Sequence, residues 1–278
     1  MLAVALGLAA SVSWGISDFL GGLKSRTLEL LTVLVLSQGM GLLLIAVVVG
    51  VRGEPAPDGA HVVLACLSGV AGVAGLASFY RGLAIGAMAV VAPISSTAAA
   101  IPVAFGLITG ERPAGFQVVG ISVAIAGVAL ASRELPEDEA PRLAAGAGLA
   151  LLSALGFGSF FVTMDVASEK DVFWAIFFNR ATSLSLLLAF ALALRPRLSV
   201  RRPDVGALLA IGALDISANG LFAAATTEGL VSLVAVLASL YPVVTILLAR
   251  LVLGEHIRRL QQAGVVAVLL GVALISAG

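Results

Sequence analysis

Charged and polar side chains inside long apolar segments are the residues of this sequence that could do chemistry. Asp18, Arg180 and Asp215 each lie within an apolar run, where an ionised side chain is costly unless it is paired or faces water. Trp14 and Asp18 are four residues apart, as are Asp215 and Asn219, so each pair shares one face of a helix. Trp14 and Asn219 could bind a polar solute. Asp18, Arg180 and Asp215 could relay a proton or form a structural ion pair, and Arg180 could instead snorkel to the interface or face water; we keep these roles open.

A second set of candidates consists of hydroxyl-bearing residues in or near other apolar segments. Ser95 and Thr97 lie close to prolines in one segment, Ser239 and Tyr241 lie close to a proline in another, and Tyr80 ends a third. Hydroxyl groups at such positions can contact a solute, or they can bond a neighbouring turn or helix. The predicted substrate-binding residues are therefore Trp14, Tyr80, Ser95, Thr97, Asn219, Ser239 and Tyr241.

The composition excludes several classes of protein. Of the 278 residues, 60% are hydrophobic and only 12% are charged, whereas a soluble domain has about 25% charged residues. The 16 basic and 16 acidic residues cancel, which argues against a nucleic-acid partner. Cys66 is the only cysteine, the two histidines are far apart, and no HExxH, GxSxG, P-loop or CxxC motif occurs. We therefore predict a protein that is not an enzyme and holds no metal or cofactor.

The elements that must position these side chains are apolar segments of membrane length. A helix needs roughly 20 mostly apolar residues to cross the hydrocarbon core. Short gaps that hold Pro, Gly and charged residues separate the segments, and the longest polar gap runs from Arg133 to Arg142. The sequence predicts an all-α integral membrane protein with ten transmembrane helices, near 2–22, 30–50, 60–79, 86–108, 115–131, 144–164, 172–194, 205–225, 230–252 and 260–277.

The chain contains an internal repeat. GERPAGFQVVGISVAIAGVALAS, which begins at Gly110, matches GEHIRRLQQAGVVAVLLGVALIS, which begins at Gly254, at nine of 23 positions. Shared composition could supply a few identities, but it does not readily supply nine that include Glu and Gln. We predict a first five-helix repeat in 1–132, a linker in 133–143 and a second repeat in 144–278. Because five is odd, the second repeat enters the membrane from the opposite side, as in inverted-repeat transporters.

The sequence resembles the EamA-type, ten-helix members of the drug/metabolite transporter superfamily over nearly its whole length. The resemblance rests on a proline-containing helix that ends in Leu-Gly-Glu, here YPVVTILLARLVLGE, on STAAAIPVAFGLITGE in the first half, and on SWGISDF in the first segment. Ala98 stands at the place that matches Pro242, which departs from the pattern. The resemblance implies transport of small metabolites through a central cavity that the fourth and ninth helices line, near Ser95, Thr97 and their matches.

We predict a secondary transporter that exports amino acids or similar small metabolites by alternating access. The low aromatic content of 6% favours small solutes over drugs. The alternatives are a multidrug or cationic-compound exporter and, in a different class, a membrane enzyme or scaffold that acts on lipid-linked groups. The predicted partners are a small-molecule substrate and the lipid bilayer. Protons as a coupling ion, and a monomer or a homodimer, are left open.

The basic residues are distributed unevenly between the loops. Eleven of the sixteen Lys and Arg residues follow odd-numbered segments, Arg250 lies near the end of the ninth segment, and three follow even-numbered ones. The positive-inside rule then places the odd loops in the cytoplasm and both termini outside, whereas relatives of the resembled family keep both termini in the cytoplasm. The predicted location is the inner (plasma) membrane, with multiple crossings.

Overall fold

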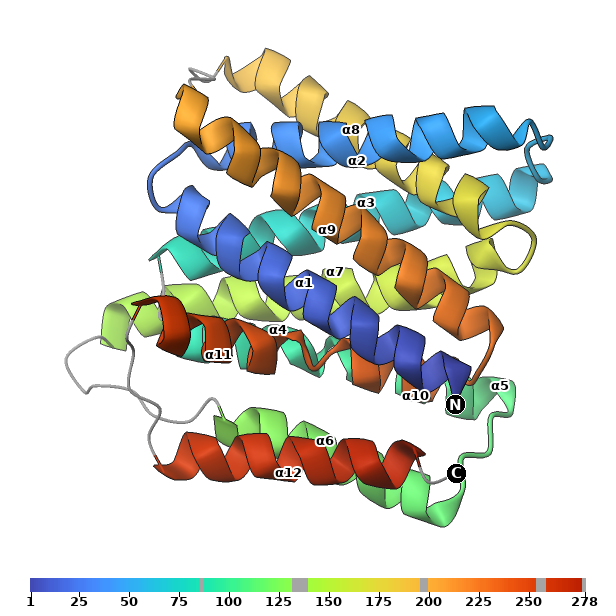
Figure 1. Cartoon of the computed structure of the whole chain (residues 1–278), viewed down its shortest axis with the longest axis vertical. Helices are drawn as coiled ribbons and strands as arrows, with labels where there is room; N and C mark the ends of the chain where they lie inside the picture. The colour runs from blue at the N-terminus through green and yellow to red at the C-terminus, as the bar shows by residue number, and fades with distance from the viewer. Residues whose placement is uncertain (86–87, 132–139, 196–199, 254–258, 277–278) are drawn as a thin grey trace.

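The computed structural model describes residues 1–85, 88–131, 140–195, 200–253 and 259–276, and every regular element in these ranges is a helix. Figure 1 shows the helices lying side by side, with both termini at the same end of the molecule. The elements are α1 (Leu2–Ser25), α2 (Leu30–Arg52), α3 (Gly59–Ile85), α4 (Met88–Ser96), η1 (Thr97–Ala99), α5 (Ala100–Thr109), α6 (Gly115–Ala131), α7 (Ala140–Ser168), α8 (Val172–Leu194), α9 (Arg202–Thr227), α10 (Val231–Ala238), α11 (Tyr241–Leu253) and α12 (Arg259–Ser276).

Helix length confirms a membrane protein, but it does not confirm ten crossings. Within the described ranges, six helices are long and apolar enough to span a bilayer: α1, α2, α3, the 148–168 part of α7, α8 and α9. The remaining apolar helices that qualify by composition are shorter, at 10–17 residues. The count of ten transmembrane helices therefore stays a prediction.

Two of the ten predicted segments are broken helices. The segment predicted at 86–108 consists of α4, η1 and α5, and the segment predicted at 230–252 is divided into α10 and α11 at Ser239 and Leu240. Pro102 and Pro242 lie in the first turns of α5 and α11, where a residue without an N–H is tolerated. A proline further inside a helix would remove a hydrogen bond, so each proline favours a new helix start. With the shift of 144 residues, the break at Ser239 and Leu240 matches Ser95 and Ser96, directly before η1, so the two breaks lie next to each other in the sequence repeat.

The packing of the helices fits two inverted repeats. If α1, α2 and α3 correspond to α7, α8 and α9, then the contact between α1 and α9 is equivalent to that between α3 and α7. The contacts of α2 with α9 and of α3 with α8 are equivalent in the same way, and α6 packs against its own equivalent, α12. Figure 1 shows α1 running from the end that holds the termini and α7 running back toward it, as inverted halves require.

Small residues allow these helices to approach closely. A Cβ atom on Gly156 of α7 would lie 2.6 Å from the Cα of Gly75 in α3, and one on Gly271 of α12 would lie 2.6 Å from the backbone nitrogen of Ala124 in α6. Small residues let helix backbones come together in lipid, where the hydrophobic effect supplies no force between helices. Gly271 therefore serves the packing of α12 against α6.

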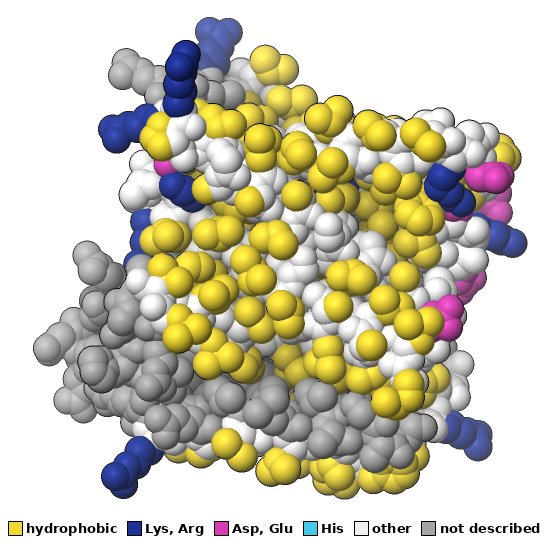
Figure 2. Space-filling model, in the orientation of Figure 1, with side chains coloured by type: hydrophobic (Ala, Val, Ile, Leu, Met, Phe, Trp, Pro, Cys, Tyr) yellow, Lys and Arg dark blue, Asp and Glu magenta, His cyan; other side chains and the backbone are white. Residues whose placement is uncertain are grey.

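The outer surface suits a lipid environment. Figure 2 shows apolar side chains over most of the visible face, with basic and acidic side chains near the two edges where the helices end. At one of these ends Asp171 accepts hydrogen bonds from the backbone of Phe173 and Trp174 and so begins α8. Asp58 begins α3 in the same way by accepting from the backbone of His61, and the hydrogen bond with the His61 ring lowers the pKa of that exposed carboxyl group.

Candidate substrate cavity

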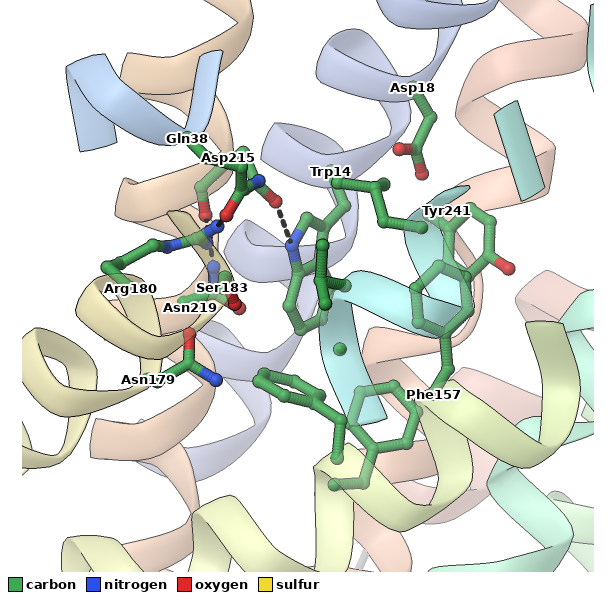
Figure 3. A pocket seen from close by; sticks show the side chains of 15 residues that line it. Trp14, Asp18, Gln38, Phe157, Asn179, Arg180, Ser183, Asp215, Asn219 and Tyr241 are labelled. Carbon is green, nitrogen blue, oxygen red and sulfur yellow. Dashed lines mark hydrogen bonds and ion pairs between the residues drawn. The ribbon is translucent and has the colours of Figure 1, made fainter. Parts of the chain in front are cut away.

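A small cavity lies in the interior, between helices of the two predicted repeats. Its volume is ≈ 50 Å³, which is enough for one or two water molecules at about 30 Å³ each. Side chains from α1, α2, α3, α7, α8, α9 and α11 surround it (Figure 3). The lining residues are Trp14, Asp18, Gln38, Gly72, Val73, Leu76, Phe157, Phe160, Phe161, Asn179, Arg180, Ser183, Asp215, Asn219 and Tyr241.

A buried ion pair forms one side of the cavity. The Arg180 guanidinium lies 2.7 Å from Oδ2 of Asp215, and both side chains are almost fully buried. Gln38 binds both partners: its amide nitrogen donates to Asp215 over 3.3 Å, and its carbonyl oxygen accepts from Arg180. Trp14 Nε1 donates to the other carboxylate oxygen of Asp215 over 3.1 Å. Trp14 and Gln38 belong to the first repeat and Arg180 and Asp215 to the second, so the network joins the two halves.

Asp18 lies on the other side of the Trp14 indole, next to Tyr241 (Figure 3). Its side chain is only 5% exposed, and no Lys, Arg or His of the described ranges forms an ion pair with it. The Tyr80 hydroxyl interacts with Asp18 and with Ser17. Asp18 is therefore a buried carboxylate in the cavity wall without a cationic partner among the residues that the structure describes.

Aromatic rings form much of the remaining wall. The ring centroids of Trp14 and Phe222 are 5.8 Å apart, and those of Phe157 and Tyr241 are 6.4 Å apart with nearly perpendicular planes. Tyr241 is buried, and its hydroxyl has no hydrogen-bond partner in the described structure. Between these rings, the carboxylates, Arg180 and a few amide and hydroxyl groups are the polar contacts that the lining offers.

Hydrogen bonds fix the other polar side chains of the lining. Asn179 donates to the Ser68 hydroxyl over 2.8 Å, and Ser183 donates to the Gly69 carbonyl over 2.9 Å, so both tie α8 to α3. Asn219 donates to the Asp215 carbonyl one turn earlier in α9, over 2.9 Å. The nitrogen Nε of Arg180 is buried without an acceptor in the part of the chain that is described, so the cavity retains an unused donor.

The structure brings together six of the ten residues that the sequence singled out. Trp14, Asp18, Arg180, Asp215, Asn219 and Tyr241 all line the cavity. The alternative that Arg180 pairs with a buried acid is confirmed, and the acid is Asp215.

Four predicted residues lie outside the lining. Thr97 corrects the expectation most clearly, because it is exposed and its hydroxyl donates to the carbonyl of Ile94 in the preceding helix α4 over 2.6 Å. It begins η1, and the positional match with Tyr241 did not reveal its exposure. Tyr80, Ser95 and Ser239 are buried, but they pack between helices and do not face the cavity.

Gln38 is the residue that sequence reasoning missed. It is 2% exposed and contacts both members of the ion pair. The rule that applied to Asp18 and Asp215 applies to it as well, because an amide inside an apolar segment needs a partner. Applied to the second predicted segment, at 30–50, the same rule would have identified Gln38.

Glu111 connects the two repeats away from the cavity. Its carboxylate accepts hydrogen bonds from the backbone nitrogens of Val231, over 2.8 Å, and Ser232, over 3.3 Å, at the start of α10. A carboxylate is favourable at the positive end of a helix. Glu111 therefore caps a helix of the other repeat. Its counterpart Glu255 lies outside the described residues.

The fold and the cavity define a helical membrane protein with a polar interior site. The model of the EamA-like transporter family matches the chain twice, over residues 1–133 and 144–277. The chain therefore belongs to the EamA-like transporter family, as its resemblance to the superfamily indicated. No curated protein matches the chain. A solved structure described only as a crystal structure of a protein superposes with a TM-score of 0.77 at 17% identity, over 99% of this chain and 96% of the other, which shows a shared fold.

Family membership sets the broad function. EamA-like proteins are membrane transporters of small solutes and are not enzymes, so this chain is a multi-pass membrane protein of a transporter family.

Proposed function

We propose that the protein is a secondary transporter that exports amino acids or similar small metabolites from the cell through the inner (plasma) membrane. The observation that carries this proposal is the buried network of Trp14, Gln38, Arg180 and Asp215 beside the cavity. Charged groups inside a membrane are retained where they serve a solute or ion pathway. This network also joins the two repeats, so any solute bound there contacts both.

The volume of the cavity supports alternating access. A space of ≈ 50 Å³ is too small for a free amino acid without rearrangement. Binding from either side then requires the repeats to separate on that side and to close around the solute. Inverted repeats provide for this, because exchanging the conformations of the two halves converts an outward-facing site into an inward-facing one.

The contacts between the repeats suit such a movement. Ser13 and Ser17 of α1 donate to backbone carbonyls of α9 over 2.8 and 3.1 Å, and Thr245 of α11 donates to the carbonyl of Gly15 over 3.2 Å. Interhelical hydrogen bonds in membranes are worth only about 0.6–2 kcal/mol each. A modest binding energy is therefore enough to exchange them as one half rocks against the other.

Counterflow in proteoliposomes tests this proposal. Vesicles that contain the purified protein are loaded with one unlabelled compound from a panel of amino acids, sugars and organic cations, and entry of the labelled compound is followed. We expect exchange of at least one amino acid or related metabolite. Arg180→Gln should abolish this exchange, because it removes the charge at the cavity. Lys24→Gln, at an ion pair outside the cavity, should not.

Two results would contradict the proposal. One is the absence of exchange for every compound in the panel with correctly assembled protein. The other is exchange that Arg180→Gln and a cavity-filling variant both leave unchanged, because a solute path through this cavity could not tolerate either.

A further inference from the structure

The charges of the cavity lining do not balance. Asp18 and Asp215 contribute two carboxylates and Arg180 contributes one cation. Asp215 forms an ion pair with Arg180 at 2.7 Å, and it accepts further hydrogen bonds from Trp14 and Gln38. Asp18 is left with hydroxyl contact alone, because its described polar partner is Tyr80. A buried carboxylate is costly to keep ionised without a compensating cation.

The surroundings of Asp18 have the chemistry of a site for an organic cation. Figure 3 shows the Asp18 carboxylate and the Tyr241 ring on one side of Trp14, with Arg180 and Asp215 on the other. Tyr241 is 3% exposed, and Figure 3 shows its ring near Asp18, with the hydroxyl on the side of the ring that faces away from Asp18. The faces of Tyr241, Phe157 and Trp14 can stabilise a positive charge as aromatic rings do for ammonium ligands.

From this charge imbalance and these partners, we infer that Asp18 and Tyr241 bind the ammonium group of the transported solute. The inference rests on the proposed function and deepens it, since it names the chemical group by which the solute is recognised. The ammonium group would neutralise Asp18 and lie against the aromatic ring of Tyr241. The ion pair between Arg180 and Asp215 would remain intact on the other side of the Trp14 indole.

Binding to Trp14 can be measured apart from transport. The second tryptophan, Trp174, lies at the start of α8 outside the cavity, so Trp174→Phe leaves Trp14 as the reporter of the site. The purified protein is titrated with L-leucine, with isopentylamine, which lacks the carboxylate, and with isocaproate, which lacks the ammonium group. The corresponding alanine set, with ethylamine and propionate, covers smaller solutes.

The ammonium-bearing compounds should change Trp14 emission saturably, and the two carboxylates without an ammonium group should not. Asp18→Asn should weaken the ammonium response at least about tenfold, as loss of a buried charge partner does. Asp18→Glu, which restores the charge, should recover part of it. Asp204→Asn, which removes a carboxylate outside the cavity, should have no effect. Size-exclusion profiles show whether each variant remains assembled.

The inference is overturned if isocaproate or propionate binds as well as the amines, if Asp18→Asn leaves the ammonium response unchanged, or if no ammonium compound responds. Counterflow separates this failure from failure of the proposed function. Exchange of a solute without an ammonium group would overturn the inference and leave transport standing. Saturable ammonium binding without any exchange would support the inference and count against transport.

Discussion

At the scale of single residues, Asp18 and Asp215 differ in their partners although both are carboxylates in apolar helices. Asp215 has a cation and two further hydrogen-bond donors, whereas Asp18 has hydroxyl contact alone. A satisfied buried network specifies and rigidifies a core, and a carboxylate without a cation is available to a ligand. The sequence left the same roles open for both acids. The geometry places Asp215 in the structural ion pair and leaves Asp18 available to a ligand.

Filling the cavity should stop transport. Tyr241→Trp adds volume to the wall of a cavity of ≈ 50 Å³, so we expect loss of exchange with little change in folding. Thr97→Trp is the matched control, because Thr97 stands at the equivalent position of the other repeat but is exposed. Counterflow and size-exclusion chromatography of both variants measure the difference. Equal inhibition by the two variants would contradict the assignment of Tyr241 to the cavity.

The ion pair should behave as a unit. Arg180→Gln or Asp215→Asn alone leaves the other charge buried and unpaired, which costs about 3–5 kcal/mol. The double variant should recover part of this loss because neither charge remains. Thermal unfolding in detergent measures the stability of the three variants. The same cycle at Lys24 and Asp204, where the pair is more exposed, should show much smaller coupling. Additive losses at Arg180 and Asp215 would exclude a direct pair.

At the scale of elements, the helices are held together where glycine removes a side chain. The contact between α3 and α7 includes Gly156, where an added Cβ would lie 2.6 Å from the Cα of Gly75 and 2.7 Å from its backbone nitrogen. Backbone atoms cannot give way as a flexible side chain can. Close packing at this point therefore depends on glycine, whatever the helix propensity of the alternative.

Alanine at position 156 should loosen this contact. We expect Gly156→Ala to cost about 1–3 kcal/mol, as overpacking typically does. Gly148→Ala in the same helix is the control, because an added Cβ there meets nothing within 4 Å and alanine favours the helix. Melting temperatures of the two variants in the same detergent provide the comparison. A Gly156→Ala protein as stable as Gly148→Ala would show that α3 and α7 do not pack as described.

At the scale of the whole molecule, equivalent helices run in opposite directions. Figure 1 shows α6 and α12 side by side and antiparallel. Gly115 and Arg259, which are exposed, occupy equivalent positions 144 residues apart at the starts of these helices. They should therefore lie on opposite faces of the membrane, whichever face is cytoplasmic.

Single cysteines at these positions test the inverted repeat. Gly115→Cys and Arg259→Cys, each in a Cys66→Ala background, are treated with an impermeant thiol reagent on intact cells. One variant should react at once and the other only after the membrane is opened. Because the loop before α12 follows an odd-numbered segment, the charge distribution predicts that Arg259→Cys is the protected one. Labelling of both from the same side would contradict the inverted arrangement.

Transport is expected to respond to a pH gradient if Asp18 exchanges a proton during the cycle. The groups that face Asp18 are Tyr80, Tyr241 and, through its charge, Asp215. Asp18→Asn should then abolish the response, whereas Asp204→Asn outside the cavity should keep it. Uptake into proteoliposomes with and without an imposed gradient is the measurement. Wild-type transport that ignores the gradient would show that the solute gradient alone drives the carrier.

The sequence by itself determined that the chain is helical, membrane-embedded and built from a repeated half. Apolar length, charge content and the match between Gly110 and Gly254 are local or one-dimensional properties, so they need no knowledge of packing. The same reasoning identified the intramembrane groups Asp18, Arg180 and Asp215, because a charged residue type within a long apolar segment can be recognised without knowing its partners.

Only the tertiary structure decided which of these groups meet. Asp215 takes Arg180 because α8 and α9 bring them within 2.7 Å, and Gln38 joins them from α2 across 142 residues of sequence. Thr97 is exposed, although its match Tyr241 lies in the cavity. Distances between helices and the direction of a side chain at a helix break depend on packing, and a linear pattern does not encode them.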